Sequence, residues 1–151
     1  HDALPILQAA VGCAQLKKFP SFVERRIYNF NRLYEKLQVV SDKLILPKAA
    51  EHAVPSWFGF IVTCKEGVDR NKVVPYIEGK GVQTRMLFAG NLTKHPCFDQ
   101  MRENHSGYRI AGDLTVTDTI MEKSFWVGVY PGMTDEMLDY MAKTMIEAVE
   151  E

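Results

Sequence analysis

The stretch that decides the fold runs from residue 57 to residue 88: 57-WFGFIVTCKEGVDRNKVVPYIEGKGVQTRMLF-88. Its first eight residues are mostly aromatic or β-branched and end at a Lys-Glu-Gly sequence, which predicts a strand over 57–64. Asp69 is suited to cap a helix from residue 70 to about residue 80. A second strand over about 82–88 follows at once. A strand, a helix and a strand in quick succession predict an α/β layer.

The chain downstream of this stretch completes the predicted layer. The run FWVGVY over 125–130 predicts a third strand, and Thr134 is placed to cap a final helix that extends to about residue 150. Two short helices are expected between the second and third strands, over about 96–103 and 115–123. The predicted fold class is therefore α/β, with a small, mainly antiparallel three-stranded sheet. The helices of 69–80 and 134–150 are expected to cover one face of it.

The chain upstream of residue 57 predicts a long helical arm. Apolar residues recur at helical spacing from about residue 4 to residue 37, and Pro20 interrupts them, which predicts two helical segments with Ser21 capping the second. Residues 38–56 read as a connection with one short extended piece near 44–46. The expected domains are thus 1–53, the arm and connection, and 54–151, a small α/β domain. An arm and connection of this length suggest a piece of a longer protein.

Composition excludes several classes of function. The 151 residues carry a net charge of -1, with 46% hydrophobic and 25% charged residues, which is typical of a globular protein and gives no electrostatic reason to bind nucleic acid. No apolar run is long enough to span a membrane. The three cysteines are far apart, which favours free thiols in a reducing compartment over disulfides or a metal site. We therefore expect a cytoplasmic protein without a metal.

The residues show no self-contained active site. The four histidines fall in a terminus, loops or a helix edge, where capping or solvation is the commoner role. Arg85 lies in a predicted strand between apolar residues, where a buried guanidinium needs either a carboxylate partner or an anionic ligand; both readings remain open. The segment 84-TRMLFAGNLTKHP-96 combines a flexible Gly90 with hydrogen-bonding side chains, which suits a binding loop. The alternative is a strand that runs into a surface turn.

Four segments together resemble one enzyme family. They are QAAVGCAQL at 8–16, RRIYNFNRLYEKL at 25–37, GVQTRMLFAGNLTKHP at 81–96 and FWVGVYPG at 125–132. The chain is similar to the C-terminal part of the DegT/StrS group of sugar aminotransferases and dehydratases. Within it, the chain most resembles the branch that contains CDP-4-keto-6-deoxyglucose 3-dehydratases, because Asn-Leu-Thr stands at 91–93 where the aminotransferases tend to have Pro-Leu-His. The resemblance implies the small domain of the aspartate-aminotransferase architecture, known as pyridoxal-phosphate (PLP) fold type I.

The resemblance also implies an activity for the longer parent protein. This is the dehydration of a nucleotide sugar by pyridoxamine phosphate (PMP), in the biosynthesis of lipopolysaccharide O-antigen 3,6-dideoxyhexoses. An NADH-dependent flavin iron–sulfur reductase is the implied partner, and the cofactor-holding residues and any iron–sulfur ligands are expected upstream. The chain alone is then expected to be inactive and to bind no cofactor. It is expected to contribute substrate-binding residues and no catalytic residue: Arg85, Phe88, Asn91, Lys94 and His95.

Two other functions stay open at this stage. One is a domain of a PLP-dependent sugar aminotransferase, which an upstream lysine in place of histidine would identify. The other is a non-catalytic α/β ligand-binding module.

One departure from the family pattern is Ile6, where the family usually has an aspartate two residues before Gln8. A further expectation concerns association: an apolar stripe on the arm lacks a partner, which favours a dimer or a larger assembly. The stripe includes Leu7, Val11, Phe22 and Phe30.

Overall fold

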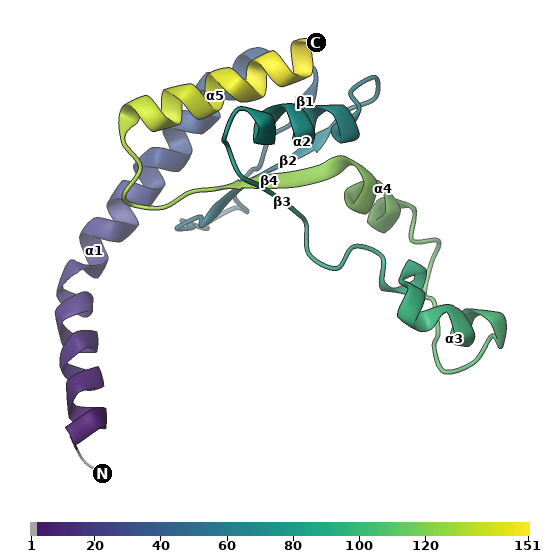
Figure 1. Ribbon diagram of the computed structural model, residues 1–151, viewed down its shortest axis with the longest axis horizontal. Coiled ribbons are helices and arrows are strands. Elements are labelled where there is room, and N and C mark those ends of the chain that lie inside the picture. The colour runs from purple at the N-terminus through teal and green to yellow at the C-terminus, as the bar shows by residue number, and fades with distance from the viewer. Residues whose placement is uncertain (1–2) are drawn as a thin grey trace.

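The computed structural model describes residues 3–151 as a four-stranded antiparallel sheet with helices on one face (Figure 1). The helices and strands are α1 (Ala3–Leu37), β1 (Leu44–Ile45), β2 (Gly59–Cys64), α2 (Arg70–Gly79), β3 (Thr84–Met86), α3 (Asp99–Glu103), α4 (Thr115–Lys123), β4 (Ser124–Gly128) and α5 (Asp135–Glu150). Three short 3₁₀ helices add to these: η1 (Gln38–Val40), η2 (Leu92–Lys94) and η3 (Pro96–Phe98). The α/β class and the antiparallel sheet agree with the prediction from the sequence.

The sheet has one strand more than the sequence predicted. Its order is β1-β2-β4-β3, and β1 pairs with the end of β2 through Leu44 and Ile45. Two residues are too short a run to show a period in the sequence, so the segment was expected only as an extended piece. Conversely, β3 ends at Met86 and not at residue 88. Met86 pairs with Phe125, one residue from the start of β4, so the chain beyond it has no neighbouring strand to bond.

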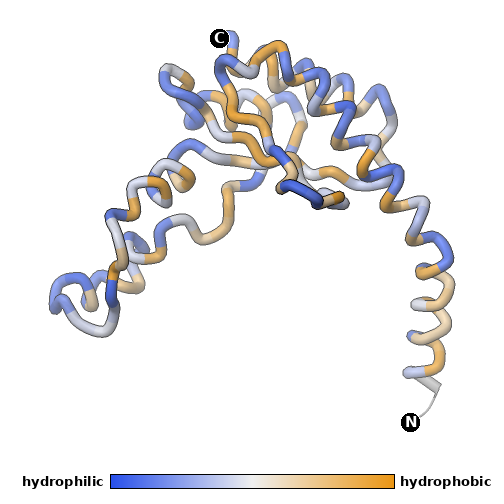
Figure 2. Tube along the Cα trace, turned by 180° about the vertical axis from the view of Figure 1, so that it is seen from behind, coloured by the Kyte–Doolittle hydropathy of each residue, from blue (hydrophilic) through white to orange (hydrophobic). Residues whose placement is uncertain are grey.

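The core lies between the sheet and three helices. Along β2 and β4, alternate side chains point to one face, and Phe60, Val62, Phe125 and Val127 are fully buried there. Figures 1 and 2 show α1, α2 and α5 on this side, while the opposite face of the sheet carries no helix. The prediction that α2 and α5 share one face is confirmed. We call the opposite face, which displays Ile61, Trp126 and Arg85, the open face.

Helix α1 runs without interruption through Pro20, contrary to the predicted break. Proline removes one backbone hydrogen bond and crowds the carbonyl of the preceding turn, at a cost of roughly 3 kcal/mol inside a helix, but it does not forbid helix on either side. The hydroxyl of Ser21 donates to the carbonyl of Lys18 at 2.8 Å, so it bonds back into the helix and does not cap a second one. Figure 1 shows α1 changing direction partway along its length, which is the usual outcome of an internal proline.

The two halves of α1 have different surroundings. In the C-terminal half, Leu33 and Leu37 are fully buried in the same core as the strands, and Phe30 packs on Trp57 and Phe60 with ring centroids 5.1 and 4.9 Å apart. Phe30 was expected in an unpartnered stripe, and that expectation was wrong. The partners of Phe30 are Trp57, in the connection before β2, and Phe60 on β2, which no local pattern in the sequence indicates. The expected boundary between residues 53 and 54 separates segments that share this core.

Hydrogen bonds and ion pairs hold α1 against α5, and we call this set of contacts the α1–α5 seam. Arg32 forms a two-pronged bond with Asp139, with nitrogen–oxygen distances of 2.9 and 3.0 Å. Asp135 accepts from Tyr28 and from Arg25, both at 2.8 Å. Hydrogen bonds from Tyr28 and Arg25 lower the pKa of Asp135, and the bond from Arg32 lowers the pKa of Asp139. These contacts set the angle at which α1 leaves the domain.

The N-terminal half of α1 leaves the domain and stays exposed. Leu7, Val11 and Leu16 each keep more than 60% of their surface accessible. Figure 2 shows these hydrophobic turns projecting away from the rest of the chain. None of the helices in residues 3–151 combines the length and apolar character needed to cross a membrane.

Candidate functional site

The chain between β3 and α4 forms a loop that is held by a buried asparagine. Asn91 is only 3% exposed, and its amide nitrogen donates to Asp118 at 2.7 Å. Its side-chain oxygen accepts from the backbone N–H and the hydroxyl of Thr93, at 3.1 and 2.7 Å, which caps η2. Lys94 reaches the second oxygen of Asp118 at 2.9 Å. Asp118 on α4 therefore ties together two residues that the sequence placed in one binding loop.

The negative charge of Asp118 in this cluster is compensated by the positive charge of Lys94. Hydrogen bonds from Asn91 and Lys94 lower the pKa of Asp118, so the carboxylate is charged at neutral pH. His95 donates from Nε2 to the carbonyl of Ala89, which closes the loop on itself. The guanidinium of Arg102 donates to the carbonyl of His95 at 3.0 Å. The loop is thus shaped by its own side chains, with its backbone groups largely satisfied.

Gly90 is required by the way the loop meets α4. Its φ of 61° lies in the left-handed region, and a Cβ atom there would come within 2.6 Å of Met121 Cγ. The neighbouring backbone N–H of Asn91 points at the sulfur of Met121, at 3.3 Å. A side chain at position 90 would push the loop off α4, which explains why glycine precedes the asparagine.

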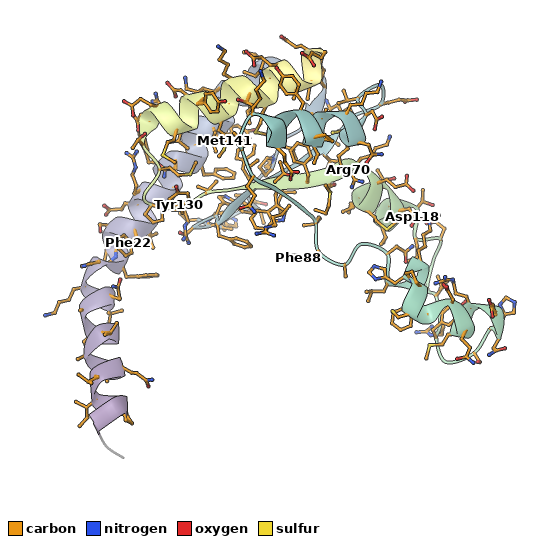
Figure 3. All side chains as sticks on the ribbon, in the orientation of Figure 1. Phe22, Arg70, Phe88, Asp118, Tyr130 and Met141 are labelled. Carbon is orange, nitrogen blue, oxygen red and sulfur yellow. The ribbon has the colours of Figure 1, made fainter. Side chains whose placement is uncertain are left out.

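Arg85 and Phe88 lie apart from this cluster, toward the open face. Arg85 is exposed, so the expectation of a buried guanidinium was wrong: β3 is the edge strand of the sheet, and its open face has no helix over it. Phe88 is 73% exposed. Figure 3 shows Phe88 on the side of the sheet away from Met141 on α5, with Asp118 at a distance from it on α4. Both side chains are free to meet a ligand that approaches the open face.

A groove of about 470 Å³ begins beside Arg85. It lies where β3 and β4 diverge, and α5 forms one of its walls. Its lining includes Gln83, Arg85, Trp126, Tyr130, Met137 and Tyr140. The hydroxyl of Tyr140 donates to the carbonyl of Lys80 at 2.9 Å and closes one end. A cationic side chain beside aromatic walls suits a planar, anionic ligand.

The structure thus separates the five predicted site residues into two groups. Arg85 and Phe88 face outward beside the groove, while Asn91, Lys94 and His95 bond within the loop. Sequence reasoning missed Asp118 and Trp126. Asp118 is 27 residues from Asn91, and a carboxylate on an amphipathic helix gives no local sign of such a partner. The only available signal was the buried asparagine itself, because a buried amide needs partners.

Neither a buried lysine nor a cluster of potential metal ligands occurs among the residues whose side chains the structure describes. A PLP enzyme holds its cofactor through a buried lysine, or a residue in its place, and an acidic partner for the ring nitrogen. Every lysine within residues 5–151 is exposed or half-exposed, and Lys94 is committed to Asp118. No group of three or more potential metal ligands occurs among the residues that the structure describes.

Comparison with known proteins identifies the family. The model of the DegT/DnrJ/EryC1/StrS aminotransferase family matches residues 3–146, nearly the whole chain. The chain belongs to this family. Two curated members of the DegT/DnrJ/EryC1/StrS family show strong similarity to the chain. The lipopolysaccharide biosynthesis protein RfbH of Salmonella typhimurium is 46% identical over 143 residues, which cover 93% of this chain and 32% of that protein. The dTDP-4-dehydro-2,6-dideoxy-D-glucose 3-dehydratase of Saccharopolyspora spinosa is 44% identical, over 95% of this chain and 30% of that protein.

Solved structures of DegT/DnrJ/EryC1/StrS-type enzymes show the same fold. A GDP-4-keto-6-deoxy-D-mannose-3-dehydratase of E. coli, solved with hydrated PLP, matches 90% of this chain with a TM-score of 0.75 and 23% identity. DesV of S. venezuelae, solved in complex with a ketimine intermediate, matches 95% of this chain with a TM-score of 0.78 and 17% identity. At these identities the match establishes the fold of the aminotransferase type and not the reaction. The chain spans about a third of the length of the curated relatives and of these solved chains.

Proposed function

We propose that this chain is the C-terminal domain of a PMP-dependent nucleotide-sugar 3-dehydratase, cytoplasmic and acting in lipopolysaccharide dideoxysugar biosynthesis. The proposal draws on two curated relatives at 44–46% identity, one named for lipopolysaccharide biosynthesis and one for 3-dehydration of a dTDP-sugar. The observation that carries it is the pairing of this similarity with an arginine that lines a groove at the edge of the sheet and an exposed aromatic ring, Phe88, on the same strand end.

In this proposal, the open face meets the substrate directly. Arg85 binds the diphosphate of the nucleotide sugar through charge-assisted hydrogen bonds, since a guanidinium fork matches phosphate oxygens. Phe88 covers the apolar side of the same ligand and excludes water. Arg85 is available to bind because it forms no ion pair among the described residues, and Phe88 is available because most of its surface is exposed.

The loop residues position this contact. Asn91, Lys94 and His95 hold the segment after Phe88 against α4, through Asp118 and the carbonyl of Ala89. We assign to Asn91 a positioning role, because its amide already has buried partners. Lys94 and His95 keep part of their surface exposed, and in this proposal they contact the edge of the substrate while Lys94 stays paired with Asp118.

We assign cofactor binding to the part of the parent enzyme that this chain does not contain. This assignment is supported by the exposure of the lysines, since none of those in residues 5–151 is buried. The chain on its own is then inactive, and its contribution is to bind and orient the sugar nucleotide. We also propose that the parent enzyme is a homodimer and that an NADH-dependent flavin iron–sulfur reductase supplies its electrons.

The reaction itself is tested on the full-length parent enzyme. It is incubated with PMP and a nucleotide-linked 4-keto-6-deoxy sugar, with a chemical or enzymatic reductant, and the product is weighed by mass spectrometry. A 3-dehydratase gives a product that has lost the oxygen at carbon 3. An amino sugar formed from PLP and glutamate instead would replace the proposal with the aminotransferase alternative.

A further inference from the structure

At the centre of the open face, the indole ring of Trp126 packs against the backbone of Gly59. Trp126 on β4 is directly opposite Ile61 on β2, and its six-membered ring extends over Gly59. A Cβ atom at Gly59 would come within 2.5 Å of Trp126 Cε3 and 3.1 Å of Cζ3. Only glycine permits this ring position, so the backbone of β2 lies against the indole, and Trp126 keeps part of its surface exposed.

Two exposed aromatic rings border this indole. The ring of Phe58 meets it edge-on, with centroids 5.4 Å apart and planes at 81°. The ring of Phe88 is tilted at 51°, with centroids 6.4 Å apart. Phe58 is 59% exposed and Phe88 is 73% exposed, so both rings remain accessible to a ligand. We call Phe58, Phe88 and Trp126 the aromatic platform.

The charge next to the platform narrows the choice of ligand. Arg85 is the cross-strand partner of Trp126, so the two side chains emerge on the same face about 5 Å apart at their Cβ atoms. Both residues also line the groove of about 470 Å³. A flat apolar ring beside one exposed cation matches a ligand with an aromatic ring and a phosphate. A purely apolar partner surface would leave the guanidinium desolvated and unpaired.

We propose that the aromatic platform stacks the base of the nucleotide, with Trp126 beneath the ring and Phe58 and Phe88 at its edges, while Arg85 holds the phosphates. This inference rests on the proposed function and names the base-binding residues of the same site. Stacking tolerates every base because each has a π face, so the platform supplies affinity and not base identity. Nucleotide binding commonly combines aromatic side chains that stack on the base with positive charge that binds the phosphates.

The two tryptophans of the chain make the platform directly observable. Trp57 is packed on Phe30 on the core side, so Trp57→Phe leaves Trp126 as the sole indole. In this variant, the indole N–H signal and the fluorescence of Trp126 are followed while cytidine, thymidine or guanosine 5′-diphosphate is added up to 10 mM. Ribose 5-phosphate carries a phosphate without a base and serves as the counter-probe. Pyridoxamine 5′-phosphate also combines a flat ring with a phosphate, so it tests whether this face binds the cofactor in place of the nucleotide.

We expect saturable changes at Trp126 with all three diphosphates and none with ribose 5-phosphate. Loss of one base–aromatic stack is worth about 1–3 kcal/mol, so Trp126→Leu should weaken binding of the diphosphates roughly 5- to 150-fold in equilibrium dialysis. Phe88→Leu should weaken it less, and Trp57→Phe should leave it unchanged. A far-ultraviolet spectrum equal to that of the unmodified chain shows that each variant is folded.

Three results would overturn the platform. Nucleotides that bind in dialysis without changing the Trp126 signal would place the base elsewhere and leave the proposed function intact. Absence of binding by all three diphosphates at 10 mM would mean that the platform does not stack bases, whatever product the full-length enzyme gives. Tighter saturation by pyridoxamine 5′-phosphate than by the diphosphates would assign the face to the cofactor.

Discussion

Replacing Phe30 tests whether the second half of α1 belongs to the core of the domain. The ring is 7% exposed and packs on Trp57 and Phe60 at centroid distances of 5.1 and 4.9 Å. Phe30→Ala removes this ring and leaves a cavity beside Trp57 and Phe60, which typically costs about 3–5 kcal/mol. Since domains of this size have about 5–15 kcal/mol of stability, the loss should be large in urea unfolding followed by circular dichroism.

The matched control is Phe19→Ala on the same helix. Phe19 is 58% exposed, and substitutions at such positions usually change the free energy of unfolding by about 0.5 kcal/mol or less. If Phe30→Ala does not fold, Phe30→Leu keeps most of the volume and should still lower the midpoint measurably more than the control. Equal effects of the Phe30 and Phe19 variants would refute the reasoning, because α1 would then be a separate arm along its whole length.

Three further outcomes follow from the structure. The exposed first half of α1 should drive self-association, so sedimentation should show a dimer or larger species that Val11→Glu shifts to monomer; an unchanged distribution would remove this surface from the interface. Burial raises the pKa of the Cys64 thiol to about 11, so only the other two thiols should react with a thiol reagent at pH 8, and all three should react in denaturant. The pKa values of Asp135 and Asp139 are lowered in the folded chain, so their contribution to stability is present above about pH 4 and is lost as the pH falls through the folded values. The melting temperature should therefore drop between pH 6 and pH 3, and drop less in Asp139→Asn; parallel curves for the two proteins would contradict the α1–α5 seam.

The sequence was sufficient for the elements with a strong local pattern. The cap at Asp69 is present, with its side chain accepting from the N–H of Asn71 at 2.9 Å, and the cap at Thr134 accepts from Met137 at 3.3 Å. Strands β2 and β4 were found because aromatic and β-branched residues dominate them. These features depend on neighbours within a few residues, which a sequence displays directly.

The errors came from contacts between distant segments. Pro20 was predicted to break the helix because local rules account for the lost hydrogen bond and not for the packing that stabilises the rest of α1. The two-residue strand β1 exists only through its pairing with β2. Arg85 looked buried because its sequence neighbours are apolar, yet the strand is at the sheet edge with nothing over one face. Local sequence does not reveal which face a sheet leaves uncovered.

The same limit applies to the candidate site. Its segment was recognised from a glycine beside hydrogen-bonding residues, and all five chosen residues lie on or next to that loop. Their division of labour was not visible, since the partner of Asn91 is on α4, 27 positions away. Trp126 was assigned to a strand and nothing more, because its place over Gly59 depends on the register between β2 and β4.

The substitution Arg85→Ala in the full-length parent enzyme tests most directly whether this chain contacts the substrate. Loss of one charge-assisted bond to the nucleotide sugar should cost about 2 kcal/mol in transition-state stabilisation, or roughly a 30-fold fall in kcat/KM. The affinity for pyridoxamine phosphate, titrated spectroscopically, should not change. The control is Arg109→Ala, at an exposed position between α3 and α4, which should leave both kcat/KM and the affinity for the cofactor unchanged. An unchanged kcat/KM for Arg85→Ala, or a loss of cofactor binding, would contradict the substrate-binding role of the open face.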